Sequence, residues 1–217
     1  MHQRTAPRSA RAVRTATFLL AAVTLWAAAP DRARAFYGPT GYIDLAPQPG
    51  SRFQLNAGIG GLYPGYGSLF VGGDILLGPR LSIPVGIQGF FFAGGGGFSA
   101  DAGVRYRLAS VLSLGGGIGG MFAGFSGDGW YGDGGDFHVW LELSAGKRFG
   151  RVGISASLRP TFGTVWGAIM LPVELDLAFF VSERWAVVVT LTGAPWIGYD
   201  GYLYGNVGGY LGLSGRL

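Results

Sequence analysis

Long segments of this chain alternate, residue by residue, between an apolar side chain and a small or polar one. The clearest segment is Asp136–Phe149. Its apolar positions share one parity and are Phe137, Val139, Leu141, Leu143 and Ala145. The other parity holds His138, Trp140, Glu142, Ser144 and Arg148. Because successive side chains of a strand point to opposite faces, this pattern predicts a strand with one apolar and one polar face.

Ten segments of this kind follow one another after residue 51. They are Arg52–Tyr63, Ser68–Leu77, Leu81–Phe92, Phe98–Leu108, Val111–Phe125, Asp136–Phe149, Val152–Val165, Ala168–Val181, Trp185–Ile197 and Tyr204–Leu217. Alternating strands of about 10 residues joined by turns are typical of a transmembrane β-barrel. We therefore predict an all-β fold, a closed antiparallel up-and-down barrel of ten strands, with eight strands as the alternative.

The connections between these segments alternate in length. Four are tight and lie near Pro79, Ala109, Gly150 and Glu183. Longer regions at 93–97, 126–135 and 198–201 lie between them. Outer-membrane barrels place short turns in the periplasm and longer loops outside, so this order predicts which end of the barrel is which. The Trp166-Gly167 connection is an exception, because it is short where an outer loop is expected.

The first 35 residues have the parts of a secretory signal peptide. A basic start containing Arg4, Arg8, Arg11 and Arg14 precedes an apolar core at 18–29 and a small-residue site at 33–35. The core is shorter than the roughly 20 residues of a membrane-spanning helix. We therefore predict a cleaved signal at 1–35, a periplasmic lead-in at 36–51 and the barrel at 52–217, with export to the outer membrane of a Gram-negative-type bacterium.

Composition narrows the function classes. Only 13% of the residues are charged and 42 are glycine, whereas a soluble domain carries about 25% charged residues. Residues 1–35 contain six arginines and one acid, which leaves ten basic and eleven acidic residues in the remainder. The basic charge therefore belongs to the predicted signal, and a nucleic-acid partner is not expected. The chain has no cysteine and two histidines, so we expect no disulfide framework and no metal site. We expect no cofactor either.

The apolar face is expected to meet lipid and the polar face to line the lumen. The polar face is mostly Gly, Ala and Ser, which would make a poorly hydrated exterior, and the chain has one lysine after the predicted signal, Lys147. Aromatic residues gather near the predicted outer ends, as in an interfacial girdle. The proposed girdle is Tyr63, Tyr66, Trp130, Tyr131, Trp166, Trp196 and Tyr199. A soluble secreted barrel that binds a small apolar ligand is an alternative.

The region Arg52–Leu217 resembles the small outer-membrane barrels of the OmpA and OmpX group in pattern. The last segment alternates apolar residues, although it ends in Leu217 where such families usually end in an aromatic residue. The resemblance implies outer-membrane lipids, lipopolysaccharide and the barrel-insertion machinery as partners.

The polar face carries a balanced set of charges. The acids are Asp74, Asp101, Glu142, Glu174 and Asp176, and the bases are Arg105, Arg107, Arg148, Arg159 and Arg216. A two-residue turn at Gly150-Arg151 places Glu142 opposite Arg159, within ion-pair reach. If Trp166-Gly167 is also a two-residue turn, Arg159 faces Glu174 as well. We therefore predict a lumen cluster of Glu142, Arg159 and Glu174, near Asp176, Asp101 and Arg105.

Two functions follow from such a lumen: a structural barrel, or a narrow pore with a polar constriction. Inward glycines such as Gly115, Gly117, Gly119, Gly208 and Gly212 leave room for water or let large side chains pack closely. A lipid-modifying barrel enzyme is a further alternative. It is not expected, because His138, the single histidine after the predicted signal, has Gly163 as its predicted cross-strand partner and no serine beside it. We therefore expect no catalytic residue.

Overall fold

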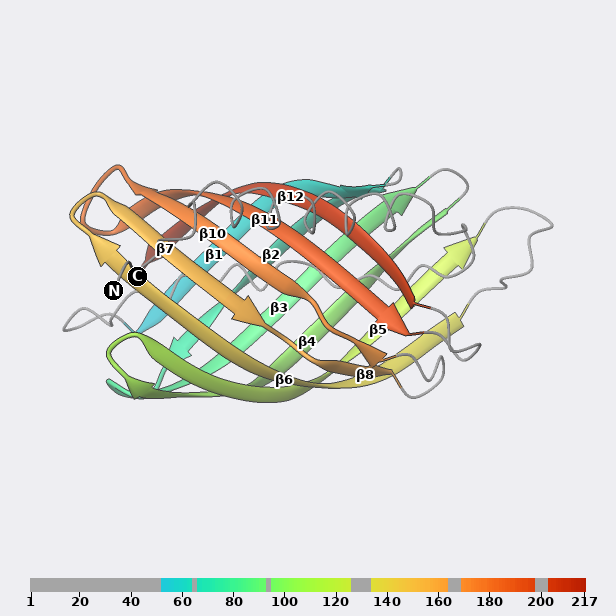
Figure 1. Ribbon diagram of the computed structural model, residues 1–217, viewed down its shortest axis with the longest axis horizontal. Coiled ribbons are helices and arrows are strands. Elements are labelled where there is room, and N and C mark those ends of the chain that lie inside the picture. Colours follow the sequence, from blue (N-terminus) through green and yellow to red (C-terminus); the bar gives the residue numbers. More distant parts are fainter. Residues whose placement is uncertain (1–51, 64–65, 93–94, 126–133, 164–168, 198–202) are drawn as a thin grey trace, which may run out of the picture. The chain divides into compact units, whose positions relative to one another are not determined.

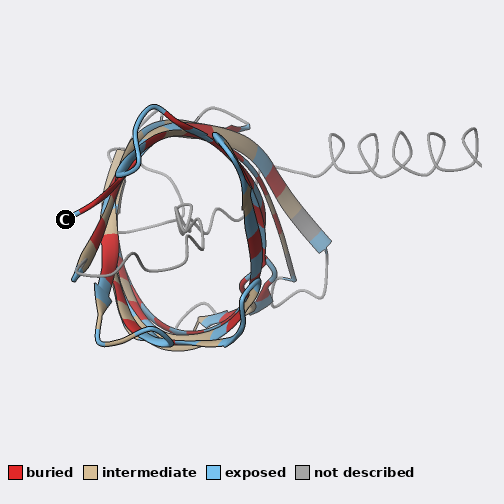
Figure 2. Cartoon of the chain, turned by 90° about the vertical axis from the view of Figure 1, so that its left-hand side faces the viewer, coloured by how far each residue is buried: buried red, intermediate tan, exposed pale blue. Residues whose placement is uncertain are grey.

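One closed antiparallel sheet makes up the part of the chain that the computed structural model describes, namely residues 52–63, 66–92, 95–125, 134–163, 169–197 and 203–217. Neighbouring strands pair in chain order, and β1 (Phe53–Tyr63) pairs with β12 (Leu203–Arg216), so the sheet closes into a barrel (Figures 1 and 2). The predicted signal peptide and lead-in lie outside the described residues. No helix among the described residues is long and apolar enough to cross a membrane.

Ten strands cross the barrel, as predicted, and the eight-strand alternative is wrong. Besides β1 and β12, six strands cross without interruption: β2 (Tyr66–Leu76), β3 (Leu81–Phe92), β4 (Gly95–Ala109), β5 (Leu112–Phe125), β6 (Gly134–Phe149) and β11 (Trp185–Ile197). The other two crossings are each divided in two: β7 (Val152–Leu158) with β8 (Thr161–Gly163), and β9 (Ile169–Met170) with β10 (Val173–Phe180).

A proline lies in each of the two divisions. Pro160 lies between β7 and β8, and Pro172 lies between β9 and β10. Proline has no backbone N–H, so it removes one ladder hydrogen bond. Its carbonyl still accepts: Leu141 N–H donates to the Pro160 oxygen (N···O 2.9 Å), and Arg159 N–H donates to the Pro172 oxygen (2.9 Å). The ladder therefore continues past each break.

The two faces of the wall lie as the alternation predicts. On β6, Leu141 is 56% exposed on the outside, whereas Glu142 is 3% and Trp140 is 1% exposed. The same outward apolar face is present on every crossing; examples are Ile59, Val71, Ile87, Val104, Ile118, Ile154, Leu175, Leu191 and Leu211. A continuous apolar exterior suits hydrocarbon and not water. The alternative of a soluble barrel, which needs a polar exterior, is therefore wrong.

The turn at Gly150 sets the register of the wall between β6 and β7. Gly150 has a φ of 60°, a left-handed conformation that glycine adopts without strain. Phe149 pairs with Val152 across this turn, and Trp140 pairs with Thr161 further along. Glu142 therefore lies opposite Arg159, and the register predicted from the two-residue turn is confirmed.

Candidate functional site in the lumen

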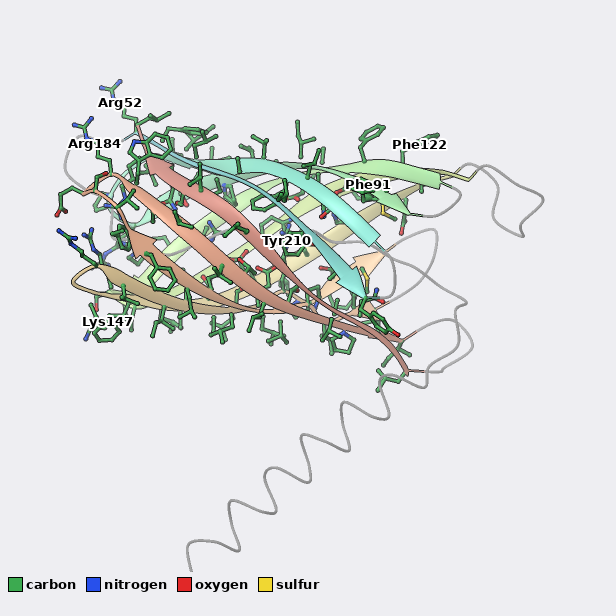
Figure 3. All side chains as sticks on the ribbon, turned by 90° about the horizontal axis from the view of Figure 1, so that it is seen from above. Arg52, Phe91, Phe122, Lys147, Arg184 and Tyr210 are labelled. Carbon is green, nitrogen blue, oxygen red and sulfur yellow. The ribbon has the colours of Figure 1, made fainter. Side chains whose placement is uncertain are left out.

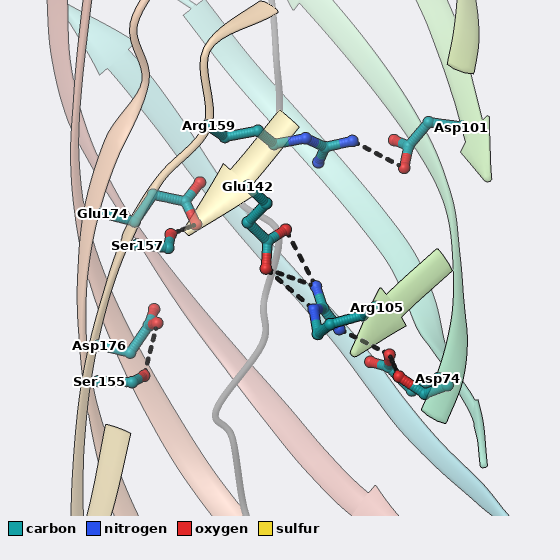
Figure 4. A network of polar contacts seen from close by, with 10 residues as sticks. Asp74, Asp101, Arg105, Glu142, Ser155, Ser157, Arg159, Glu174 and Asp176 are labelled. Carbon is teal, nitrogen blue, oxygen red and sulfur yellow. Dashed lines mark hydrogen bonds and ion pairs between the residues drawn. The ribbon is translucent and has the colours of Figure 1, made fainter. Parts of the chain in front are cut away.

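A buried arginine joins two carboxylates across the middle of the lumen. Arg105 on β4 donates from Nη1 to Asp74 Oδ1 at 2.6 Å, and from Nε and Nη2 to Glu142 at 2.9 and 3.0 Å (Figure 4). Ser82 Oγ donates a further hydrogen bond to Asp74 at 2.9 Å. All three charged side chains are at most 3% exposed. The forked contact with Glu142 holds the guanidinium in one orientation.

A glycine on the intervening strand lets Arg105 reach Glu142. Arg105 on β4 pairs with Gly115 on β5, and Gly115 pairs with Glu142 on β6, so the three residues lie in one row. A side chain at the middle position would stand between the guanidinium and the carboxylate. The sequence prediction missed this bridge because it considered adjacent strands only, although the glycine run 115–117 was a visible signal.

A second ion pair lies beside the first. Arg159 Nη2 is 3.0 Å from Asp101 Oδ1, and the Arg159 guanidinium lies over the Trp140 ring, 4.0 Å from the ring centre. Arg159 is thus held by a carboxylate on β4 and by an aromatic face on β6. A guanidinium stacked on an indole is attracted by the electrons of the ring as well as by the carboxylate.

One predicted contact in this region is wrong. Arg159 was expected to face Glu174, but Glu174 pairs with Ser157 and Leu158 pairs with Val173. The register differs by two residues from that of a two-residue turn at Trp166-Gly167, and that connection lies outside the described residues. The shift keeps Glu174 on the lumen face and moves it away from the position opposite Arg159. The ion pairs are therefore Arg105 with Asp74 and Glu142, and Arg159 with Asp101.

Hydroxyl groups line the wall that carries the remaining two acids. Ser157 Oγ donates to Glu174 at 3.4 Å, and Ser155 Oγ donates to Asp176 at 3.0 Å (Figure 4). Thr190 on β11 donates a second hydrogen bond to Asp176. Both carboxylates are buried on the lumen side. Serine and threonine hydroxyls therefore donate to these two carboxylates, whereas Arg105 and Arg159 pair with Asp74, Glu142 and Asp101.

The inward glycines of β4 and β5 are used for packing. The Trp140 ring lies against Gly103 and Gly117, and a Cβ at Gly117 would be 2.5 Å from Trp140 Cζ2. His138, which pairs with Gly163 as predicted, lies against Gly119 in the same way. Trp140 and His138 are each 1% exposed. Of the two roles that the sequence left open for these glycines, close packing of large side chains is the one that the structure shows.

Because the Trp140 ring lies against Gly117, a methyl group at this position should destabilise the protein. We expect Gly117→Ala to lower the free energy of unfolding by about 1–3 kcal/mol, because the new Cβ overlaps Trp140 and the Ala102 carbonyl. Gly89→Ala is the matched control, since a Cβ there meets nothing within 4 Å. Urea unfolding from lipid vesicles measures both variants, and equal stability of the two would contradict the packing.

The lumen also contains apolar layers that the alternation did not predict. One buried cluster consists of Leu62, Phe70, Phe90, Met121, Ala123 and Tyr210. Phe70 and Tyr210 meet edge to face, with ring centres 5.9 Å apart. A second cluster consists of Ala178, Phe180, Ala186 and Val188, near the short turns. Apolar side chains therefore fill part of the lumen on either side of the ion pairs.

The predicted aromatic girdle is described only in part. Tyr63 is 67% exposed at the outer end of β1. The side chains of Tyr66 and Trp196 are not described, and Trp130, Tyr131, Trp166 and Tyr199 lie outside the described residues. Outward phenylalanines that the prediction omitted lie near the same end; they are Phe91, Phe98, Phe122 and Phe137. Figure 3 labels Phe91 and Phe122 among them. Their parity within each strand was the signal that could have identified them.

A small polar cavity adjoins the ion pairs. Its volume is about 40 Å³, and its lining includes Asn56, Gln88, Asp101, Arg105 and Arg159. The buried Asn56 amide oxygen has no hydrogen-bond partner in the described part of the protein. A cavity of this size has room for a few water molecules. The described residues contain no group of three or more His, Cys, Asp or Glu side chains placed to hold a metal ion.

Solved structures with a similar fold are outer-membrane β-barrels. The KdgM porin in complex with disordered oligogalacturonate is 9% identical, with a TM-score of 0.44, over 76% of this chain and 99% of the porin. The outer-membrane protease OmpT from Escherichia coli is 12% identical, with a TM-score of 0.44, over 82% of this chain and 100% of the protease. The translocator domain of the autotransporter NalP from Neisseria meningitidis is 14% identical, with a TM-score of 0.35, over 96% of each chain.

No protein-family model and no curated protein matches the chain. The structural likeness, at these identities, shows the fold alone. It does not single out the OmpA and OmpX group, so that narrower resemblance stays a prediction.

The expectation that the chain is not an enzyme needs correction. Barrels of this fold include the protease OmpT, so the fold does not separate this chain from barrel enzymes. The likeness assigns no catalytic residue to the chain either.

Proposed function

We propose that this protein is an outer-membrane barrel that forms a narrow, hydrated passage for small ions. The observation that carries the proposal is the band of buried charges across the middle of the lumen, beside a water-sized polar cavity. The continuous apolar exterior supports a position in the membrane. Localisation in the outer membrane, after export directed by residues 1–35, is part of the same proposal.

Water in the lumen is supported by the polar atoms around the cavity. Buried amides normally have hydrogen-bond partners, and an amide without a protein partner needs water or a ligand. Asn56 lies in the cavity lining, and its amide oxygen is such an atom.

The charges at this level favour cations. The band contains five carboxylates and two guanidinium groups: Asp74, Asp101, Glu142, Glu174 and Asp176 against Arg105 and Arg159. Rings of Asp and Glu select cations in pores. The structural alternative, a barrel closed by the same side chains, has no passage at all, and a current measurement separates the two.

Trp140 is the side chain that we expect to limit the passage. It fills the lumen between Arg159 and the glycines of β4 and β5. We therefore expect a small, cation-preferring conductance from refolded wild-type protein in planar bilayers, and a conductance several times larger from Trp140→Ala.

Trp185→Ala is the matched control for the pore experiment, because Trp185 points outward at the end with the short turns. Its conductance should equal that of the wild type. If neither the wild type nor Trp140→Ala carries a current, the pore is rejected and the closed structural barrel is the remaining interpretation. An anion-preferring reversal potential in a salt gradient would keep the pore and reject the carboxylate band as its selectivity element.

A further inference from the structure

One end of the barrel is ringed by exposed basic side chains. It is the end with the short turns and the C-terminus, which is the periplasmic end by the loop rule. The exposed cations are Arg52, Arg80, Lys147, Arg151 and Arg184, and together they are called the cationic rim. They belong to the start of β1, the β2–β3 turn, the end of β6, the β6–β7 turn and the β10–β11 turn. Figure 3 labels Arg52 and Arg184 near one side of this end and Lys147 at the other side.

The cationic rim has little compensating negative charge. Among the described residues at this end, Glu183 is the one acid, and it lies 3.6 Å from Arg148. Arg148 is not a member of the rim; it lies over the Phe180 ring, 3.8 Å from the ring centre, and donates to the Gly150 carbonyl at 2.7 Å. The five exposed cations therefore present a net positive surface.

The basic residues of the chain gather toward one end of the barrel. Every basic residue after the predicted signal lies in the rim, in the lumen or near the short turns, and the connections at 126–133 and 198–202 contain acids and no Lys or Arg. Those acids are Asp128, Asp133 and Asp200. Among the described residues, the exposed basic side chains are thus confined to the end with the short turns.

The rim lies where the apolar exterior ends. Outward apolar residues directly beside it include Leu77, Leu81, Phe149, Val181, Trp185 and Leu217. Lys147 itself lies over the Phe149 ring, 5.4 Å from its centre. Trp and Lys side chains next to an apolar belt occupy the headgroup level of a bilayer. The rim is thus continuous with the lipid-facing surface and faces the headgroups of the periplasmic leaflet.

We propose that the cationic rim binds the phosphates of anionic phospholipids in the periplasmic leaflet. The charge is complementary, and basic residues at a membrane surface attract anionic lipids over about one Debye length. Guanidinium groups also match the geometry of phosphate oxygens. This binding anchors the barrel at one level in the bilayer and is independent of any passage through the lumen.

The experiment compares unfolding of the refolded full-length chain from two kinds of vesicle. One kind is phosphatidylcholine alone, and the other contains phosphatidylglycerol as well. We expect the urea midpoint of the wild type to rise with phosphatidylglycerol and the rise to shrink at high salt. We expect the triple variant Arg80→Gln/Arg151→Gln/Arg184→Gln to show less than half of the wild-type rise in urea midpoint with phosphatidylglycerol. Its urea midpoint in phosphatidylcholine alone should equal that of the wild type.

Glu183→Gln is the control of opposite sign, because it removes the acid beside the rim. It should enlarge the rise that phosphatidylglycerol causes. The proposal is overturned if phosphatidylglycerol does not raise the wild-type midpoint, or if the triple variant keeps the full rise. A midpoint that rises with a soluble acidic polypeptide and not with anionic vesicles would also overturn it, and would assign the rim to a periplasmic protein.

Discussion

Replacement of Arg105 by methionine is expected to lower the free energy of unfolding by about 3–5 kcal/mol. The variant leaves Asp74 and Glu142 in the lumen without the guanidinium that contacts both of them at 2.6–3.0 Å. Neither carboxylate can turn to bulk water, since both are buried. Methionine keeps most of the volume of the arginine stem, so the lost charge and its hydrogen bonds dominate the change. Urea unfolding from vesicles is the measurement.

Two controls separate the buried bridge from the general effect of removing an arginine. Arg151→Met, in the exposed β6–β7 turn, should change stability by less than about 0.5 kcal/mol. The triple variant Arg105→Met/Asp74→Asn/Glu142→Gln removes the stranded charges together with their partner, and it should recover most of the loss. A stable Arg105→Met variant, or a triple variant as unstable as the single one, would show that the bridge does not hold the lumen.

Much of the wall could be predicted from the sequence because strand geometry is periodic. On β6, the parity of Leu141 and Glu142 predicted which side chain points outward and which points into the lumen, and the structure agrees. The left-handed Gly150 fixed the next register, because a two-residue turn allows one pairing of Phe149 with Val152. Strand parity and turn length therefore predict contacts between neighbouring strands, but not contacts between strands farther apart in the sheet.

Contacts across the lumen were not predictable in the same way. The Arg105 bridge crosses two strands, and the Arg159 pair joins β7 and β8 to β4 on another part of the wall. Which residues meet there depends on the stagger of all ten crossings around the barrel. A bulge between Arg107 and Ala109 changes that stagger, and the two-residue shift of Glu174 changes it again.

The alternation of apolar and polar residues along each strand also could not predict the two apolar clusters inside the lumen. Phe70 and Phe90 have the same parity as polar lumen residues of their own strands, such as Asp74 and Gln88. A phenylalanine on the polar parity is ambiguous in sequence, because it suits either a bulge or a packed lumen. The inward glycines resolve this ambiguity, since Phe70 lies against Gly58, where no side chain fills the space. Pairing large and small inward residues across neighbouring strands is the pattern to search for.

An arginine on the outer face at mid-height is expected to cost about 2–4 kcal/mol of the free energy of unfolding. Leu141→Arg and Leu175→Arg are the two variants, because both leucines are exposed outward near the centre of a crossing. In hydrocarbon the guanidinium has no water and no partner, and its stem is too far from either interface to bring the charge out. Urea unfolding from vesicles measures the loss.

If the outer face contacts lipid, the cost of an arginine depends on its depth in the bilayer. The control is therefore an arginine substitution near an interface. Val181→Arg, beside the β10–β11 turn and 71% exposed, should cost at most about 1 kcal/mol. In detergent or water an exposed leucine tolerates arginine at any height, so equal and small costs at all three positions would reject the lipid-facing exterior. A cost that follows depth requires a hydrocarbon slab around the barrel, because only a bilayer makes the middle of the wall different from its edge.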